Sequence, residues 1–408
     1  MIEKVFIYDN QLTNPVYYSN FFSSLEKLNF NPICRVSNYI EVFKNIVFSI
    51  LIDREITLLD YDFPDHEIKD LDIKNDEINS SSFNILDQVP SLNLFIKSIN
   101  TLNRWSITLY TSGTTGKPKK VVHKSDSLIR FVKSGKSRSD DIWGFTYNPT
   151  HIAGLQVFFQ ALLNMNSIVY IYNRNKKEIQ ASFDKYRVTN ISATPTFYRL
   201  LQPFSQEYSN VKYVTSGGER LDNNLSNFLN MIFPNAKLTN VYASTEVGSL
   251  FASKGEYFKI PDKFQKYIKI ENKELLVHKK ITAQTLPNNE KWLRTGGIVE
   301  FKNDSNILFK IIARNNELIN VGGYNVNLSE IEELLRLNNS VLDCIVYSKP
   351  HRLVGNIICS DVVLKDDNVK EIELKKYLSQ KIQKYKIPAI INIVDSLKIN
   401  RANKLIRS

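Results

Sequence analysis

Short apolar runs alternate with longer amphipathic or polar stretches through the middle of the chain. From position 143 onward the apolar runs are rich in Val, Ile and Tyr, which is typical of buried strands. We expect strands at 168–172, 190–193, 211–214 and 238–241, and helices at 197–201 and 225–233. Strands that alternate with helices pair in parallel, and ligands of such sheets bind beyond the carboxyl ends of the strands. The predicted fold class is therefore α/β, with parallel-rich sheets and helices.

The first hundred residues predict a similar but less regular mixture. Strands are expected at 4–8 and 56–59, a helix at 18–28, and a surface loop over the acid- and Asn-rich stretch 62–82. Together with the middle of the chain, they are expected to form a large N-terminal domain that spans 1–314.

A second, smaller domain is expected to fill 315–408. Ser329 and Glu332 have the spacing of a capping box, which predicts the start of a helix. Strand-like runs follow at 343–347 and 357–364, then an amphipathic helix through 382 and a short strand at 390–394. The pattern predicts a small α+β domain of ordinary size.

The segment at 110–119 reads Tyr-Thr-Ser-Gly-Thr-Thr-Gly-Lys-Pro-Lys and stands between two predicted strands, 107–110 and 120–123. Glycine lets backbone N–H groups turn toward a ligand, while hydroxyl and ammonium groups donate to phosphate oxygens. The common phosphate loop is excluded because its glycines are more widely spaced and a helix follows it directly. Here Pro118 follows, and a helix is expected only at 128–132. A turn that holds a polyphosphate is favoured over the alternative, a solvated linker.

The segment at 111–119 also resembles the signature of the adenylate-forming superfamily, which comprises acyl-CoA synthetases, carrier-protein adenylation domains and luciferases. Later segments resemble that family's other motifs, in the family's order, and they run to the end of the chain. They stand at 148–154, 216–219, 241–246, 292–296, 313–314, 319–324 and 403–407. The chain is similar to a compact member of the family, closest to the o-succinylbenzoate and aryl-acid CoA ligases, partly through Pro-Thr-His-Ile-Ala-Gly-Leu at 149–155.

The resemblance implies a mobile C-terminal lid that carries a catalytic lysine, Lys404. It also implies that Glu246 binds magnesium, that Thr245 joins a phosphate cradle and that His151 positions the acyl carboxylate. The implied nucleotide- and cofactor-binding residues are Thr111, Ser112, Gly113, Thr114, Thr115, Gly116, Lys119, Gly217, Gly218, Glu219, Tyr242, Ala243, Ser244, Arg314, Gly322 and Gly323. Among these, Tyr242 would stack on adenine, Arg314 would contact ribose, and the two last glycines would admit a pantetheine arm.

Plainer interpretations exist for three of these positions. Lys404 is also a lysine close to the chain end, and His151 is also a histidine in a turn after Pro149. Gly322 and Gly323 can simply shape a turn.

The implied reaction is ATP-dependent activation of a carboxylic acid. The acid would form an acyl-adenylate with release of pyrophosphate and would then pass to the thiol of coenzyme A. Transfer to the phosphopantetheine of an acyl carrier protein is the alternative acceptor. A nucleotide-binding pseudoenzyme or regulator is the alternative from another class, and it is motivated by Gly297, which stands where the family has a ribose-binding Asp. Asn403, in place of the usual Gly, is a milder departure.

Composition fits a soluble globular protein. The chain has 408 residues, of which 43% are hydrophobic and 23% charged, and no apolar run approaches the length of a membrane span. Three scattered cysteines and the lack of a basic-then-apolar leader predict a cytoplasmic protein with reduced thiols. The net charge of +11 is spread among acidic residues, so attraction of ATP and coenzyme A is favoured over nucleic-acid binding.

Overall fold

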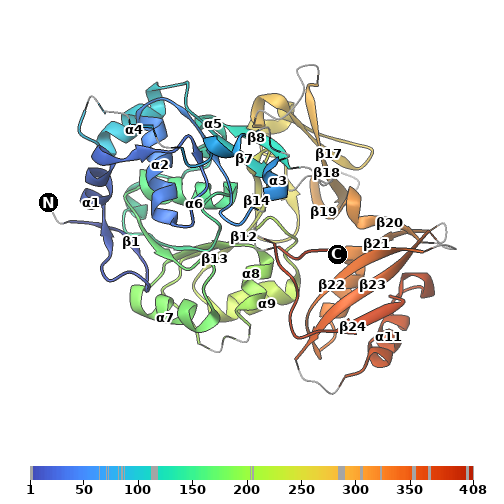
Figure 1. The fold of residues 1–408 in the computed structure, drawn as a ribbon. Coiled ribbons are helices and arrows are strands. Elements are labelled where there is room, and N and C mark those ends of the chain that lie inside the picture. The colour runs from blue at the N-terminus through green and yellow to red at the C-terminus, as the bar shows by residue number, and fades with distance from the viewer. Residues whose placement is uncertain are drawn as a thin grey trace.

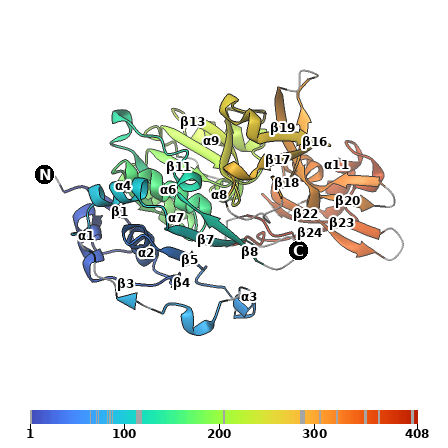
Figure 2. The same ribbon diagram turned by 90° about the horizontal axis from the view of Figure 1, so that it is seen from above.

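The computed structural model describes most of the chain in two unequal parts (Figure 1). The described residues are 3–63, 65–69, 71, 73–80, 82–83, 86, 88–111, 118–202, 204, 206–283, 290–303, 307–321, 324–351, 355–365, 369–400 and 404–407. A large body holds the N-terminal three quarters of the chain, and a smaller part built on a sheet follows it (Figure 1, Figure 2). The C-terminus lies where these two parts meet in both views.

An eight-stranded sheet forms the centre of the large body, in the order β14-β13-β12-β11-β9-β10-β1-β2. Its strands are β1 (Val5–Tyr8), β2 (Val16–Tyr17), β9 (Ile142–Phe145), β10 (Ser167–Tyr170), β11 (Asn190–Ala193), β12 (Tyr213–Gly217), β13 (Lys237–Ser244) and β14 (Gly248–Ser253). The inner pairs from β13 to β1 are all parallel, and the edge strands β14 and β2 are antiparallel. The parallel pairing predicted from the alternating pattern is therefore confirmed.

The helices α6 (Ile152–Leu163), α7 (Lys176–Tyr186), α8 (Pro195–Leu200) and α9 (Asn223–Ile232) join parallel strands of this sheet. The helix α1 (Tyr18–Ser23) follows β2, and α2 (Tyr39–Leu51) connects two strands of a second, smaller sheet. Side-chain caps fix where three of them begin: Asn175 accepts from the N–H of Glu178, Thr194 from that of Phe197, and Asp222 from that of Leu225.

A smaller four-stranded sheet, in the order β4-β5-β7-β8, completes the N-terminal region. Its strands are β4 (Ile33–Cys34), β5 (Glu55–Leu58), β7 (Ser106–Thr111) and β8 (Lys119–His123), and near them lie β3 (Asn29–Phe30), β6 (Ser82–Phe83), α3 (Asp65–Lys69), α4 (Leu92–Thr101) and α5 (Ser125–Leu128). β7 and β8 pair antiparallel from Ile107 with His123 to Thr111 with Lys119. The candidate phosphate loop therefore connects two paired strands, as predicted, although residues 112–117 lie outside the described part.

A five-stranded antiparallel sheet, in the order β15-β19-β18-β17-β16, ends the large body. Its strands are β15 (Phe258–Lys259), β16 (Ile268–Glu271), β17 (Glu274–His278), β18 (Trp292–Phe301) and β19 (Leu308–Arg314). The 3₁₀ turns along the chain are η1 (Ser24–Lys27), η2 (Asn75–Glu77), η3 (Lys136–Arg138), η4 (Asp262–Tyr267), η5 (Lys279–Ile281), η6 (Asn315–Glu317) and η7 (Lys384–Lys386).

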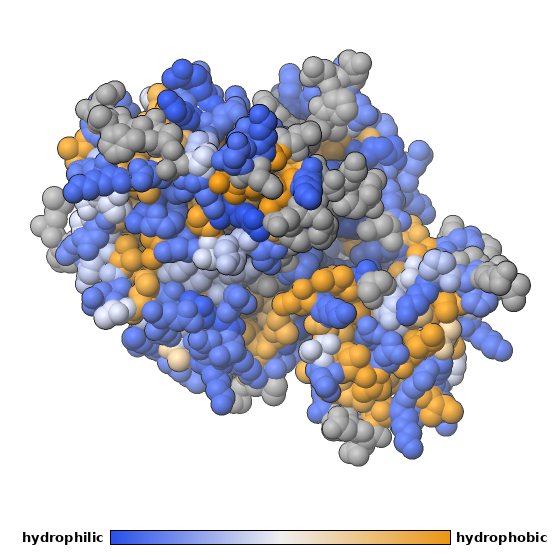
Figure 3. Space-filling model, viewed as in Figure 1, coloured by the Kyte–Doolittle hydropathy of each residue, from blue (hydrophilic) through white to orange (hydrophobic). Residues whose placement is uncertain are grey.

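The C-terminal part contains a short hairpin and a three-stranded sheet, β22-β23-β24. Its elements are β20 (Leu318–Val321), β21 (Tyr324–Asn327), α10 (Leu328–Arg336), β22 (Val341–His351), β23 (Gly355–Leu364), α11 (Glu371–Ser379) and β24 (Ile390–Ile393). Both helices pack with the sheet in one apolar core, and Figure 3 shows apolar residues gathered over this part of the surface. The predicted boundary at 314/315 falls between β19 and η6.

Several local predictions were wrong. The helix expected at 128–132 lies earlier, as α5, and the stretch 62–82 contains α3 and η2 as well as loop. Ser329 does not cap α10, because Asn327 accepts the N–H of Ser329 at 3.0 Å and is the cap. The Ser329 hydroxyl instead donates to Glu317 Oε2 at 3.1 Å. The helix expected to run through 382 ends at Ser379.

Candidate active site

A cavity of about 1300 Å³ lies over the parallel sheet of the large body. On β12, Tyr213, Thr215 and Gly217 line the cavity and are half-buried, while the alternating Val214 and Ser216 are buried on the opposite face. This alternation follows from the two-residue period of a strand. The volume exceeds that of ordinary small-ligand pockets, so one cavity has room for a nucleotide and a second substrate.

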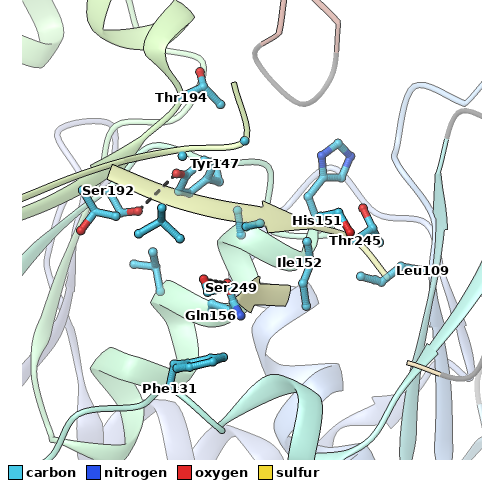
Figure 4. A pocket seen from close by; sticks show the side chains of 18 of the residues that line it. Leu109, Phe131, Tyr147, His151, Ile152, Gln156, Ser192, Thr194, Thr245 and Ser249 are labelled. Carbon is cyan, nitrogen blue, oxygen red and sulfur yellow. Dashed lines mark hydrogen bonds between the residues drawn. The ribbon is translucent and has the colours of Figure 1, made fainter. Parts of the chain in front are cut away.

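The inward residues of β13 and α6 complete the walls. Val241 and Ala243 of β13 line the sheet side. Ile152 and Gln156 of α6 line the helix side (Figure 4). In the close view, His151 and Thr245 lie together at one end of the cavity and Phe131 at the other. Two of the residues with implied catalytic roles, His151 and Thr245, therefore lie side by side on the wall of the cavity (Figure 4).

Lys404 reaches this same end from the C-terminal part. A Cβ atom placed on Gly218 would lie 3.2 Å from Lys404 Cε and 3.4 Å from Nζ, so the lysine side chain packs directly on the Gly218 backbone. Gly218 also has a φ of +83°, which L-residues adopt only with strain. Both observations explain why glycine is needed at the carboxyl end of β12.

The electrostatic setting of Lys404 is mixed. Burial lowers the pKa of its ammonium group, Glu219 and Glu246 act in the opposite direction, and Arg314 lowers it further. Two carboxylates and a guanidinium therefore surround one partly desolvated ammonium group. A negatively charged phosphate placed here would favour the charged lysine.

The segment that carries Lys404 is held by the C-terminal sheet. Asn400 N donates to Lys404 O at 2.7 Å, and Lys404 N donates to Asn400 Oδ1 at 3.1 Å. Leu405 packs in a small apolar cluster with Tyr347 of β22 and Cys359 of β23. These contacts fix the backbone from which Lys404 extends.

Arg407 adds ionic anchors to the same segment. Its guanidinium lies 2.5 Å from Glu332 Oε1 and 3.3 Å from Glu317 Oε1, and it also donates to the Val346 carbonyl. Glu317 Oε2 in turn accepts the N–H of Arg314 at 2.8 Å. The lysine-bearing segment and Arg314, the last residue before the predicted domain boundary, are thus joined through the Glu317 carboxylate.

His151 is held by a buried carboxylate that the sequence did not identify. Nε2 of His151 lies 3.0 Å from Oδ2 of Asp60. Asn148 Nδ2 donates to Asp60 Oδ1 at 3.1 Å, and the Thr150 hydroxyl donates to the same oxygen. Asp60 follows β5, so a residue some ninety positions earlier organises the His-containing segment. Its location after a predicted strand was the signal that could have found it.

Glu219 and Glu246 have different surroundings. Glu219 accepts from the N–H of Thr196 at 2.9 Å and from its hydroxyl at 3.0 Å, which ties β12 to the first turn of α8. Within the described residues, the Glu246 carboxylate makes no hydrogen bond or ion pair, although its backbone oxygen accepts from Ala283. Magnesium is commonly held by one or two carboxylates plus phosphate oxygens, so Glu246 fits such a ligand. Among the described residues, no cluster of three or more Asp, Glu, His or Cys side chains could hold a metal ion by itself.

Tyr242 and Gly297 are close neighbours. A Cβ atom on Gly297 would lie 3.2 Å from the Tyr242 hydroxyl and 3.2 Å from Thr295 Oγ1. Burial raises the pKa of Tyr242, whose ring packs 5.7 Å from that of Phe251. Arg314 stands directly opposite Gly297 in the β18–β19 pair. Tyr242 and Arg314, which the resemblance assigned to the adenine and the ribose, therefore both adjoin Gly297. The absence of a side chain at Gly297 leaves room for the Tyr242 hydroxyl.

Some of the remaining candidates line the cavity, two lie on the paired strands β7 and β8, and the others lie outside the described part. Ser244 joins Gly217, Ala243 and Thr245 on the wall, and Lys119 is an exposed residue of β8 opposite Thr111. The candidates outside the described residues are Ser112, Gly113, Thr114, Thr115, Gly116, Gly322 and Gly323.

This fold and this site define a class of nucleotide-binding enzymes. A family model for AMP-binding enzymes matches residues 55–281, and a model for the C-terminal domain of AMP-binding enzymes matches residues 330–404. The first match alone covers more than half of the chain. The chain therefore belongs to the AMP-binding enzyme family, and the superfamily recognised from the sequence is confirmed.

Particular relatives include ligases and a much longer synthase. The 2-succinylbenzoate–CoA ligase of Bacillus pumilus is 27% identical over 338 residues, covering 75% of this chain and 68% of the relative. Bacitracin synthase 3 of Bacillus licheniformis is 24% identical over 344 residues, but the match spans 73% of this chain and only 5% of that protein. The o-succinylbenzoate CoA synthetase of Bacillus subtilis, solved with an acyl-adenylate, aligns with a TM-score of 0.71 at 19% identity, covering 99% of this chain and 94% of that one. This likeness confirms the fold class.

Proposed function

We propose that the protein is an ATP-dependent, AMP-forming acid–thiol ligase whose acceptor is coenzyme A. A carboxylate oxygen attacks the α-phosphorus of ATP, the bond to the β-phosphate breaks, and pyrophosphate leaves. The thiol sulfur then attacks the acyl carbon, and AMP leaves. The observation that carries this proposal is the contact of the Lys404 side chain with Gly218 at the carboxyl end of β12.

The proposed roles follow from charge and position. The Lys404 ammonium group stabilises negative charge that develops as the carboxylate meets the α-phosphate. Thr245, which lies beside His151 on the cavity wall, donates to phosphate oxygens, and His151 orients the acyl carboxylate. Bound magnesium would neutralise phosphate charge, and Glu246 is the residue that would hold it.

We also propose the division of the chain into 1–314 and 315–408, with the second part acting as a lid. The interactions that connect these parts include an ion pair, with Arg220 Nη1 2.5 Å from Glu333 Oε1, and a hydrogen bond that Asn224 Nδ2 donates to the Arg336 carbonyl at 3.1 Å. Both support an arrangement in which Lys404 reaches the cavity. This arrangement suits the first half-reaction, and Gly322 and Gly323 are proposed to admit the pantetheine arm in the second.

The acceptor has one specific alternative. This alternative is transfer of the acyl group to the phosphopantetheine of a carrier protein. Its support is that the chain is also similar to bacitracin synthase 3, at 24% identity, over only 5% of that longer protein. Gly297 motivates the third candidate, a nucleotide-binding pseudoenzyme.

The three cysteines are free and buried, which supports the proposal of a reducing, cytoplasmic location. In the described residues we find no helix that is long and apolar enough to cross a bilayer.

Exchange of labelled pyrophosphate into ATP, over a panel of aryl, short-chain, long-chain and amino acids, tests the proposal. Acid-dependent exchange followed by a thioester on addition of coenzyme A is the expected result. Exchange without a coenzyme A product supports carrier loading, and ATP binding without exchange supports the pseudoenzyme. Lys404→Ala should abolish exchange while ATP binding persists, and exchange that survives this change contradicts the assigned role.

A further inference from the structure

Three aromatic rings meet at one end of the five-stranded sheet of the large body. His278 of β17 stands opposite Trp292 of β18, and the two rings pack edge to face with their centroids 5.0 Å apart. The ring of Tyr267, at the end of η4, lies 5.8 Å from that of His278. All three residues are half-buried, and Figure 1 shows β17 and β18 at the periphery of the large body. The rings therefore form one cluster that reaches the surface.

Lysines surround this cluster. The Lys269 ammonium group lies over the Trp292 ring, 4.4 Å from its centroid, and that of Lys266 lies 5.0 Å from the centroid of Tyr267. Three exposed lysines, which follow β17 or precede β18, complete the set: Lys279, Lys280 and Lys291. These five lysines and the three rings are here called the basic aromatic patch.

The imidazole of His278 records the positive field of the patch. Its pKa is lowered by desolvation and then by repulsion from Lys280, Lys279 and Lys291, so these three ammonium groups converge on one ring. Nδ1 of His278 accepts the N–H of Lys280 at 3.2 Å, which requires an unprotonated nitrogen at that position. The imidazole is therefore neutral at neutral pH, and lysines alone supply the charge of the patch.

Acidic residues offset this charge only in part. The stretch 262–292 contains seven lysines and four acidic residues. Two of these carboxylates are engaged in ion pairs, Glu271 with Lys269 at 2.6 Å and Glu274 with Arg294. The stretch keeps an excess of positive charge, and the surface that complements it is anionic.

The arrangement of the rings favours a membrane surface over a nucleic acid. Proteins that bind single strands offer open aromatic faces on which bases stack. Here ammonium groups lie over the rings of Trp292 and Tyr267, and His278 meets Trp292 edge to face. Tryptophan and tyrosine are enriched at the headgroup level of bilayers, and an anionic leaflet attracts lysines. Rings flanked by lysines suit that environment.

The basic aromatic patch adjoins the candidate active site through η4. Lys263 and Phe264 of this turn line the cavity, while Lys266 and Tyr267 of the same turn belong to the patch. Contact of the patch with a membrane would therefore place this wall of the cavity on the side of the molecule that faces the lipid.

From these observations we propose that the basic aromatic patch binds the surface of a membrane that contains anionic lipids. Each lysine near such a surface strengthens binding roughly fivefold, so the patch should favour anionic over neutral lipid by a factor on the order of a thousand. Because the rings are half-buried in the sheet, binding is peripheral and reversible, without insertion. The inference goes beyond the proposed function and does not depend on the reaction.

The test is co-sedimentation of the full-length chain with vesicles, without ATP or acid. Vesicles of phosphatidylcholine are compared with vesicles of equal parts phosphatidylcholine and phosphatidylglycerol. We expect binding to the anionic vesicles only, and its loss at high salt. Tryptophan fluorescence should shift to the blue on binding, and Trp292→Phe should remove the shift, because Trp105 and Trp143 are only 2% and 9% exposed.

The triple variant Lys279→Gln, Lys280→Gln, Lys291→Gln should bind the anionic vesicles roughly a hundredfold more weakly, at about fivefold for each lysine. The matched control removes the same charge from exposed lysines of α4, α7 and α11: Lys97→Gln, Lys177→Gln, Lys376→Gln. The control should bind like the unmodified protein. Both triple variants should keep full pyrophosphate exchange in the absence of vesicles.

Three results would overturn the inference. One is no binding, or equal binding to neutral and anionic vesicles. Another is an equal loss in the two triple variants, which would mean that total charge and not the patch attracts the protein. The third is tighter binding to a single-stranded RNA homopolymer than to anionic vesicles, which would assign the patch to nucleic acid. None of these results affects the proposed function, which is measured separately by exchange.

Discussion

Asp60 and His151 form a contact that joins two distant parts of the sequence, with Oδ2 of the carboxylate 3.0 Å from Nε2 of the imidazole. The carboxylate is buried and also accepts from Asn148 and Thr150, so it fixes the whole turn before α6. His151 is therefore placed by Asp60 and not by the turn alone. An imidazole whose Nε2 is engaged has a fixed orientation toward the cavity.

Asp60→Asn should lower kcat/KM for the acid roughly tenfold, which corresponds to about 1.4 kcal/mol of transition-state stabilisation. The amide keeps the shape but cannot accept from all three donors, so His151 loses its fixed orientation. ATP binding should be unaffected. Exchange kinetics of Asp60→Asn, His151→Ala and the double variant measure the coupling, and fully additive losses would show that Asp60 does not act through His151.

Gly218→Ala should reduce exchange at least about a hundredfold, because displacement of a catalytic group by 1 Å can cost this much. The new methyl group would meet Lys404 at 3.2 Å in a backbone conformation with φ of +83°. Gly135→Ala is the control, since Gly135 also has positive φ but nothing within 4 Å of the added methyl. Equal activities of the two variants would mean that contact with Lys404 does not matter.

The pH profile of exchange should have an alkaline limb set by Lys404. Burial lowers the pKa of this lysine from its ordinary 10.5, so the ammonium group loses its proton as pH rises through a value below 10.5. The rate should therefore fall in that range. Glu219→Gln removes a carboxylate that raises this pKa and should move the limb to lower pH. Profiles of kcat/KM for both proteins give the comparison, and coincident limbs would exclude Lys404 as their origin.

Discrimination between ATP and 2′-deoxy-ATP should be weak. Gly297 provides no carboxylate for the ribose hydroxyls. A site that does not hydrogen-bond a hydroxyl discriminates only weakly against a ligand that lacks it. We expect KM values for the two nucleotides within about threefold of each other in exchange assays. Rejection of 2′-deoxy-ATP by a hundredfold would mean that another residue, such as Arg314 opposite Gly297, reads the ribose.

Local patterns were sufficient for the parallel sheet, whereas the candidate site residues were implied by the family resemblance. The strand at 190–193 and the paired strands around 110–119 were predicted because each has a short apolar run with clear ends. The cap of α10 was misplaced because Ser329 and Asn327 both suit the position, and only the tertiary contact of Ser329 with Glu317 distinguishes them.

Long-range contacts accounted for what was missed. Asp60 gains its importance from packing beside a turn some ninety residues later, and its own neighbourhood in the sequence does not identify that partner. The backbone of Lys133, which lines the cavity, is likewise held by Gln160 of the later helix α6. The spacing of residues along the chain does not predict such long-range contacts.

The alternation of β12 has a consequence for engineering. Alternate residues of a strand are about 7 Å apart, so Tyr213, Thr215 and Gly217 lie at regular intervals along the cavity wall. A bulky side chain in place of Thr215 would close the cavity between Gly217 and Tyr213. Under the proposed function, the protein would then accept only shorter acids, while the part of the cavity near Lys404 would be unchanged.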